Sequence, residues 1–188
     1  MPKGLKQTSS QIVISFDTTE SAANTFTEDR IDLQLNALDN EVFVVTGVNM
    51  DVDDPELNLA DPLANFGDAE RNVRAFLSKQ SISSATTKSL GNPSVFATAK
   101  KSFQLQNTTS LANPTVNFLP IVPYIEDATD APYDVDYLDI IATADFFVSV
   151  VGQGNGQARG VAGKLYGYRA RADASTYAAL VQSELLSN

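Results

Sequence analysis

The sequence predicts an all-β protein: a two-sheet antiparallel sandwich of jelly-roll type with a short C-terminal helix. Several segments alternate apolar and polar residues with the period of two that a strand requires. A long segment near the C-terminus is rich in β-branched and aromatic residues. Long irregular loops at residues 51–70 and 123–134 separate the predicted strands, as in sandwiches and barrels. An immunoglobulin-like sandwich is the alternative, but its Cys…Trp…Cys signature cannot occur in a chain without Cys or Trp.

Three strands are predicted in the N-terminal part of the chain. Residues 11–16 (QIVISF) carry two isoleucines and a phenylalanine at alternate positions, which places them on one face. Residues 30–35 (RIDLQL) alternate strictly between polar and apolar side chains. Residues 41–50 (EVFVVTGVNM) are more continuously apolar, which is typical of a strand covered on both faces.

The middle of the chain adds three more predicted strands. Residues 72–80 (NVRAFLSKQ) fit either a strand or a helix capped by Asp68, and we favour the strand because alternate residues are apolar. Residues 94–105 and 115–122 are further strand segments, and prolines mark the ends of the second.

The C-terminal part predicts a hairpin of two long strands. Residues 135–151 form the first, with a possible bend at 142–144, and residues 159–172 form the second. The glycine-rich stretch 152–156 supplies the turn between them. Glycines within the second strand indicate bends or a close approach of neighbouring backbone (Gly160, Gly163 and Gly167).

Residues 174–186 predict an amphipathic helix whose N-terminus Asp173 could cap. Its apolar residues Tyr177, Leu180 and Val181 would pack on the sandwich or form an interface with a neighbouring copy. The chain then divides into a short polar arm, a sandwich domain and a helical tail (residues 1–10, 11–172 and 173–188).

The composition argues against an enzyme. The chain has no His and no Cys, which removes the commonest general base, the commonest metal ligand and the thiolate nucleophile. No nucleotide-binding motif is present, because the glycine-rich stretch precedes a predicted strand and not a helix. Paired carboxylates could hydrolyse glycosides, but the tryptophans usual in such clefts are missing.

Charge is distributed in blocks along the sequence, and the whole chain carries a net charge of −10. Residues 1–70 and 126–145 are acidic, residues 71–125 contain basic and no acidic side chains, and residues 146–188 are mildly basic. Blocks of opposite sign can form complementary patches that favour association between copies. The alternative is a solvated acidic surface that keeps the protein soluble.

Two acidic clusters are candidate calcium sites, because Ca²⁺ takes several oxygen ligands from flexible loops. One directly follows a predicted strand and the other lies in a proline-containing loop, and neither matches an EF-hand. The alternative is a pair of solvated loops. The candidate ligands are Asp51, Asp53, Asp54 and Glu56 in the first cluster and Asp134 and Asp136 in the second.

Sparse basic residues are candidates for contact with a phosphate backbone. No stacking aromatics are interleaved with them, and pairing with the acidic blocks is the alternative. The candidates that would face nucleic acid are Lys100, Lys101, Arg169 and Arg171.

The chain as a whole resembles the small single jelly-roll capsid proteins of icosahedral viruses. The likeness rests on the short polar N-terminus, the opening strand QIVISF, the long polar loops and the segment ADFFVSVVGQGNGQARGVAGKLYGYRARA near the end. It implies a non-enzymatic structural protein that assembles with copies of itself into a shell, is located in the virion and contacts the viral genome. Many members carry a basic N-terminal arm, whereas this chain has only Lys3 and Lys6 there, so its inner face or another component would contact the genome.

Two other classes of function remain open. One is a tail, spike or appendage module of a virus or phage. The other is a carbohydrate-binding sandwich, in which Tyr124, Tyr133 and Tyr137 could stack on sugars. We expect no membrane association, because no apolar run is long enough to span a bilayer, and the N-terminus lacks the apolar region of a signal peptide.

Overall fold

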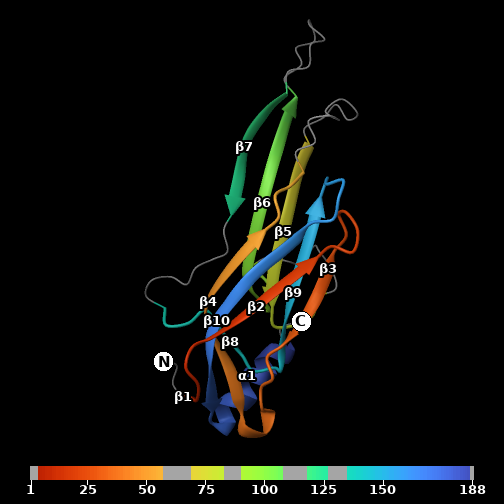
Figure 1. Cartoon of the computed structure of the whole chain (residues 1–188). Coiled ribbons are helices and arrows are strands. Elements are labelled where there is room, and N and C mark those ends of the chain that lie inside the picture. Colours follow the sequence, from red (N-terminus) through yellow and green to blue (C-terminus); the bar gives the residue numbers. More distant parts are fainter. Residues whose placement is uncertain (1–3, 57–68, 83–89, 108–117, 127–134, 187–188) are drawn as a thin grey trace, which may run out of the picture.

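A computed structural model describes residues 4–56, 69–82, 90–107, 118–126 and 135–186. It confirms the all-β prediction: two five-stranded antiparallel sheets lie face to face, and one helix follows the last strand (Figure 1). Sheet A has the order β1-β10-β4-β8, with β2 also pairing with β10, and consists of β1 (Leu5–Gln7), β2 (Ile12–Thr19), β4 (Glu41–Val52), β8 (Asp139–Ile141) and β10 (Gly160–Ala172). Sheet B has the order β3-β9-β5-β6-β7 and consists of β3 (Thr27–Asp32), β5 (Ala69–Ser78), β6 (Val95–Asn107), β7 (Phe118–Glu126) and β9 (Asp145–Gln153).

The connectivity is that of a jelly roll. Without β1 and β7, the sheets have the orders β2-β10-β4-β8 and β3-β9-β5-β6, so the chain crosses repeatedly from one sheet to the other. The strand preferred for residues 72–80 is confirmed as β5, and β1 and the short 3-10 helix η1 (Ala37–Asp39) were not predicted. β1 lies within the predicted arm and pairs with the end of β10.

The predicted C-terminal hairpin is wrong in its pairing. Residues 135–151 do not form one strand: β8 ends at Ile141 in sheet A, and β9 starts at Asp145 in sheet B. β9 then pairs with β3 and β5, whereas β10 pairs with β1, β2 and β4, so the two strands belong to different sheets. Both strands have apolar residues facing the core, and placing them in opposite sheets buries both sets between the sheets.

The main core lies between the two sheets. Its largest fully buried side chains include Phe43 and Leu165 of sheet A and Leu77 and Phe146 of sheet B. β10 approaches β4 closely at Gly167, where a Cβ atom would lie 2.3 Å from the carbonyl oxygen of Val44, as the glycines in this segment predicted.

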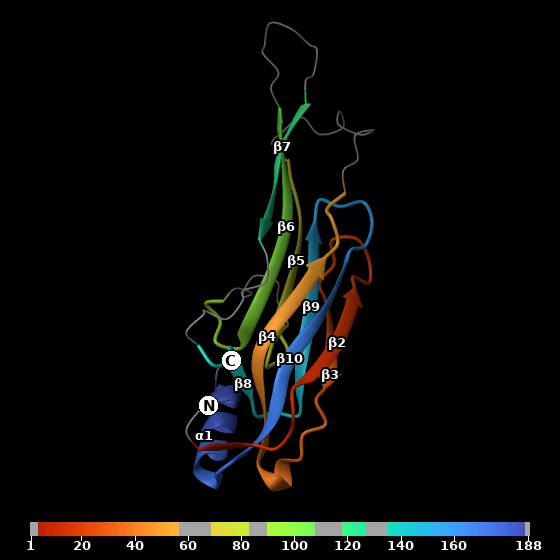
Figure 2. The same ribbon diagram turned by 60° about the vertical axis from the view of Figure 1, so that its left-hand side comes forward.

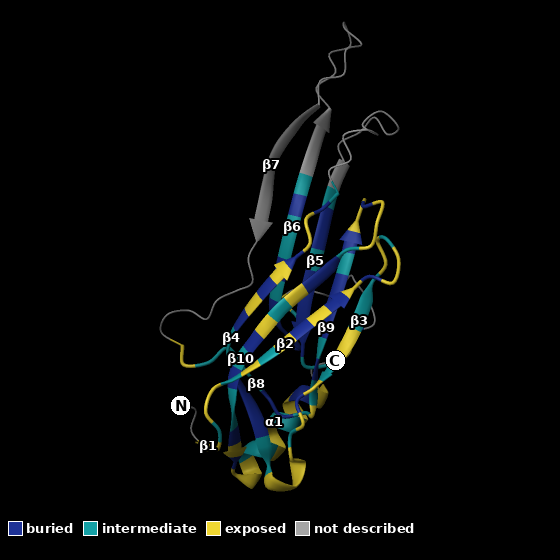
Figure 3. Cartoon of the chain, in the orientation of Figure 1, coloured by how far each residue is buried: buried dark blue, intermediate teal, exposed yellow. Residues whose placement is uncertain are grey.

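The helix α1 (Ala174–Leu186) covers the outer face of sheet A at one end of the sandwich (Figure 2). Below it, Val42 and Val44 belong to a second apolar cluster, while Phe43 and Val45 face the main core. All four are at most 1% exposed, which explains the continuous apolar run in this strand (Figure 3). In the part of the chain that the structure describes, no helix has the length and hydrophobicity of a membrane span.

Candidate functional site

The acidic segment at the end of β4 lies beside β6 and the β9–β10 loop. Asp51 and Asp54 both contact the ammonium group of Lys101, with Nζ to carboxylate oxygen distances of 2.9 and 3.3 Å. Burial alone would lower the pKa of Lys101, but the hydrogen bonds and charges of Asp51 and Asp54 outweigh it and raise this pKa. Both carboxylates are more than 80% exposed, so each pair contributes at most about 1 kcal/mol.

The other two carboxylates of this segment hold the β9–β10 loop. The backbone N–H of Gly160 donates to Asp53 at 2.6 Å, and that of Gly156 donates to Glu56 at 2.6 Å. The guanidinium of Arg159 lies 3.7 Å from Glu56. These two carboxylates therefore accept hydrogen bonds from backbone N–H groups of their own chain.

A buried glutamate that the sequence reasoning missed supports the same loop. Glu20 is only 4% exposed, and its carboxylate accepts hydrogen bonds from the backbone N–H groups of Gly152 at 2.6 Å and Arg159 at 3.0 Å. The loop ends there, where β9 leaves sheet B and β10 enters sheet A. A buried carboxylate that accepts two N–H bonds satisfies donors that the ladder leaves unpaired.

Asn155, also missed, is the centre of a second buried network in this loop. Its side-chain oxygen accepts from the N–H of Glu56 at 3.0 Å, and its amide donates to the carbonyl of Asn72 at 3.0 Å. Its backbone N–H and carbonyl bond to the side chain of Asn24 at 2.8 and 2.6 Å. A glycine-rich loop signals that acceptors are needed, but no spacing in the sequence identifies which residues supply them.

Among the residues that the structure describes, the two candidate calcium clusters do not form a common site. Asp136 is exposed next to β8, and Asp134 lies outside the described residues. Over the described ranges, no group of three or more His, Cys, Asp or Glu side chains converges in a way that could hold a metal ion. Calcium binding by Asp51, Asp53, Asp54, Glu56, Asp134 and Asp136 stays a prediction.

The four basic candidates lie on different sheets. Lys100 and Lys101 belong to β6 in sheet B, whereas Arg169 and Arg171 belong to β10 in sheet A. Arg169 donates to the carbonyl of Leu33 at 3.0 Å and lies 3.8 Å from Glu41. Lys100 and Lys101 thus lie in the opposite sheet from Arg169 and Arg171, and contact of these four residues with nucleic acid stays a prediction.

The charge blocks pair with each other within the chain. Lys101 of the first basic block contacts Asp51 of the first acidic block, and Lys79 lies 3.1 Å from Asp139 of the second. Arg171 of the last block donates to Asp39 at 3.0 Å. Folding thus brings oppositely charged blocks of the sequence into contact, because strands from different blocks become neighbours.

The face of α1 that packs on sheet A makes apolar contacts and also includes one buried carboxylate, that of Glu184. Tyr177, Leu180 and Val181 are half-buried against the outer cluster of sheet A, and so is Tyr137. Packing on the sandwich, one of the two outcomes expected for these residues, is thus observed, and an interface with a copy stays a prediction. As predicted, Asp173 caps the helix: it accepts from the N–H of Thr176 at 2.7 Å.

Glu184 of the helix is 2% exposed and accepts hydrogen bonds from the N–H groups of Ala142 at 2.8 Å and Thr143 at 3.0 Å. Burial raises the pKa of Glu184, although these bonds and the charge of Lys79 act in the opposite direction. The hydrogen bonds fasten the C-terminal part of the helix to the connection between β8 and β9.

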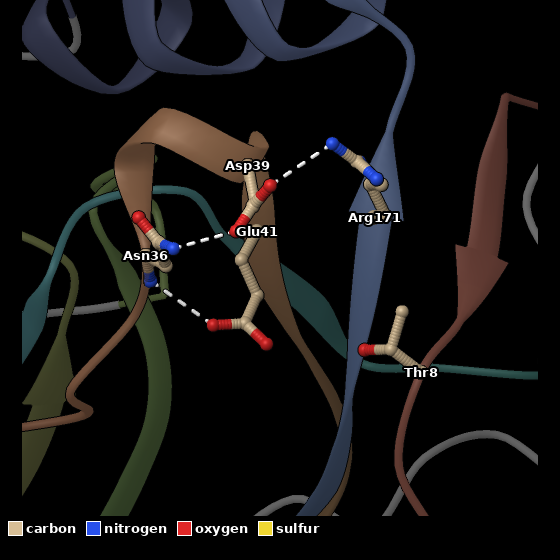
Figure 4. A pocket seen from close by; sticks show the side chains of 5 residues that line it. All are labelled: Thr8, Asn36, Asp39, Glu41 and Arg171. Carbon is tan, nitrogen blue, oxygen red and sulfur yellow. Dashed lines mark hydrogen bonds and ion pairs between the residues drawn. The ribbon is translucent and has the colours of Figure 1, made fainter.

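A polar pocket of about 370 Å³ lies beside η1, lined by Thr8, Asn36, Asp39, Glu41 and Arg171 (Figure 4). Asn36 caps the turn by accepting from the N–H of Leu38 at 3.1 Å, and its own N–H donates to Glu41 at 3.0 Å. Its side-chain amide donates to Asp39 at 2.6 Å. The pocket is thus lined by the turn, the end of β10 and the segment that follows β1.

Comparisons with known proteins identify no family. No protein-family model matches the chain, and no curated protein matches it. One solved structure that matches the chain is described as "Merkel Cell Polyomavirus VP1 Unassembled Pentamer". Its sequence is 8% identical, the match covers 92% of this chain and 97% of that chain, and the TM-score is 0.35. A likeness of this size does not bear on what the chain does.

Proposed function

We propose that this chain is a non-enzymatic structural subunit that associates with copies of itself, most specifically into the shell of a virus. The observation that carries the proposal is β7. Every residue of this strand except Glu126 is apolar, aromatic or proline, without the alternation of a strand that has one solvated face. A strand of this composition is typically covered on both faces.

β7 also lies on a part of sheet B that projects beyond the sandwich. The pairing of β9 with β5 ends at Asn72 of β5. Beyond this point β5 still pairs with β6, as far as Ala69, and β6 pairs with β7 as far as Asn107. Figures 1 and 2 show these strands reaching past the ends of the sheet A strands. A projection of at most three strands, with no second sheet over it, buries little apolar surface by itself, so a second chain that covers it would stabilise it.

The prolines of β7 favour contact through a face and not through the strand edge. Pro120 and Pro123 lie in an edge strand whose only described partner is β6. Proline has no backbone N–H, and edge prolines prevent a further strand from being added. An apolar ribbon with a blocked edge is suited to packing against another subunit without unlimited sheet growth.

Light scattering after size exclusion, with electron microscopy of the same fractions, tests the proposal. The wild-type protein is expected to form particles, and a closed shell in the micrographs would distinguish this proposal from a fibre or spike. A Leu119→Thr, Ile121→Thr variant keeps β-forming residues but replaces two apolar side chains of β7 with polar ones, so it is expected to shift to monomer. Val13→Thr, at a 51%-exposed position of β2, is the control. A wild-type protein that stays monomeric at every concentration and salt would contradict the proposal.

A further inference from the structure

The turn formed by residues 36–40 holds one apolar side chain out in solvent. Leu38 is 95% exposed, the highest value among the exposed large hydrophobic residues of the described chain. It belongs to η1, one of the shortest elements of the fold, at the tip of the connection between β3 and β4. A single exposed leucine is ordinary, but a rigidly held one is a suitable anchor for a protein contact.

The turn is held by hydrogen bonds on both of its ends. Asn36 caps its start, and the N–H of Asn40, in the left-handed conformation, donates to the carbonyl of Ala37 at 3.2 Å. The carbonyl of Asn40 accepts from the N–H of Ala172 at 2.9 Å, which ties the turn to the end of β10. Little conformational entropy therefore remains to be lost when Leu38 is covered.

The charged residues next to Leu38 are self-complementary. Asp39 and Arg171 form an ion pair at 3.0 Å in which both side chains remain more than half exposed (57% and 58%). Both also line the polar pocket, together with the half-buried Glu41. A two-fold contact uses the same patch on both partners, so one that is made through charges must carry both signs, as this patch does.

We infer that this patch, defined by Leu38, Asp39 and Arg171, is a two-fold contact with a second copy of the chain. The inference rests on the proposed function and names one of its contacts. The axis passes beside the ion pair, so that Arg171 of each copy reaches Asp39 of the other and the two Leu38 side chains meet. An apolar centre with a charged rim has the anatomy of a protein interface.

Charge reversal separates a contact between copies from the ion pair within one chain. Asp39→Arg places two cations together in its own chain, and Arg171→Asp places two anions together. When the two variants are mixed, each chain stays mismatched internally, but both contacts across the axis again join opposite charges. Sedimentation velocity at low salt, where exposed charges are least screened, is expected to show weak association for each variant alone and recovery in the equimolar mixture.

Leu38→Ser is expected to weaken association of the full chain by roughly tenfold, while Leu90→Ser, at a 51%-exposed position elsewhere, leaves it unchanged. Thermal melting of each variant checks folding, and the double variant Asp39→Arg, Arg171→Asp restores the internal pair. A mixture that associates no better than its components would overturn the inference while the proposed function stands. A wild-type chain that does not associate at all would overturn both.

Discussion

Two of the crossings between the sheets, one at each end of the sandwich, share a feature: a buried glutamate accepts two backbone N–H groups. At the helix end, residues 142–144 lead from β8 to β9, and Glu184 accepts from Ala142 and Thr143. At the opposite end, residues 154–159 lead from β9 to β10, and Glu20 accepts from Gly152 and Arg159. Each crossing interrupts a ladder, so each needs acceptors from outside the sheets.

The two crossings differ in how many groups support them. The longer one is also held by Asp53, Glu56 and Asn24, which come from two separate loops. At the shorter crossing, the N–H groups of Ala142 and Thr143 both donate to one side chain, that of Glu184 in the helix α1. A loop with several acceptors tolerates the loss of one, whereas a crossing that depends on one side chain does not.

The largest effect is expected at the helix end. Glu184→Ala leaves one buried and one part-buried N–H group without these acceptors and should lower the free energy of unfolding by about 2–3 kcal/mol. Urea denaturation at low protein concentration measures the loss, and far-UV circular dichroism reports whether the helix is retained. Glu184→Gln, which keeps one acceptor oxygen, should lose less. Equal losses for the two variants would show that the hydrogen bonds are not what holds the helix.

Glu20→Ala should cost less, about 1–2 kcal/mol, because neighbouring acceptors keep the β9–β10 loop in place. The same urea titration measures it, with Glu20→Gln as the matched control. Adding Asp53→Ala to Glu20→Ala should lower stability by more than the sum of the two single losses, since both carboxylates support the same β9–β10 loop. Simple additivity would contradict this shared support.

Asp173→Ala tests the other end of the same helix. Losing the N-cap should lower the urea midpoint, and Asp173→Asn, which keeps an acceptor, should lower it less. The hydrogen bonds from Thr176 and Ser175 lower the pKa of Asp173, so its contribution is present above about pH 3.8 and is lost as the pH falls through its lowered pKa. Urea titrations at pH 6 measure the cap, and an unchanged midpoint for Asp173→Ala would show that it is dispensable.

The smallest effect is the pH dependence of the helix end. Because the pKa of Glu184 is raised, its contribution to stability is fully present below the unfolded value of 4.5 and declines as the pH rises through the folded value. The stability of the wild-type protein relative to Glu184→Gln should therefore fall from pH 4.5 towards neutral pH, no more steeply than about 1.4 kcal/mol per pH unit. A difference that grows with pH would reverse the assigned direction of the shift.

Features that depend on near neighbours in the chain were predicted well. The helix spans residues 174–186 as its spacing indicated, and Asp173 caps it. The apolar run in β4 correctly signalled a strand covered on both faces. The strand predicted at residues 30–35 was placed less accurately, since the observed strand runs over Thr27–Asp32. Gln34 has a positive φ, which is incompatible with a continuing strand, although Leu33 still lies in the core.

By itself, the sequence determined the number of apolar faces that each segment must bury, because the alternation of side chains along a strand is local. Only the tertiary structure decided which sheet each strand joins, as the division of 135–151 between β8 and β9 shows. It also decided the partners of Glu20 and Glu184, which lie 132 and 42 residues from their first donors. A carboxylate meets these N–H groups only after the sheets have packed, so no spacing in the sequence encodes the contact.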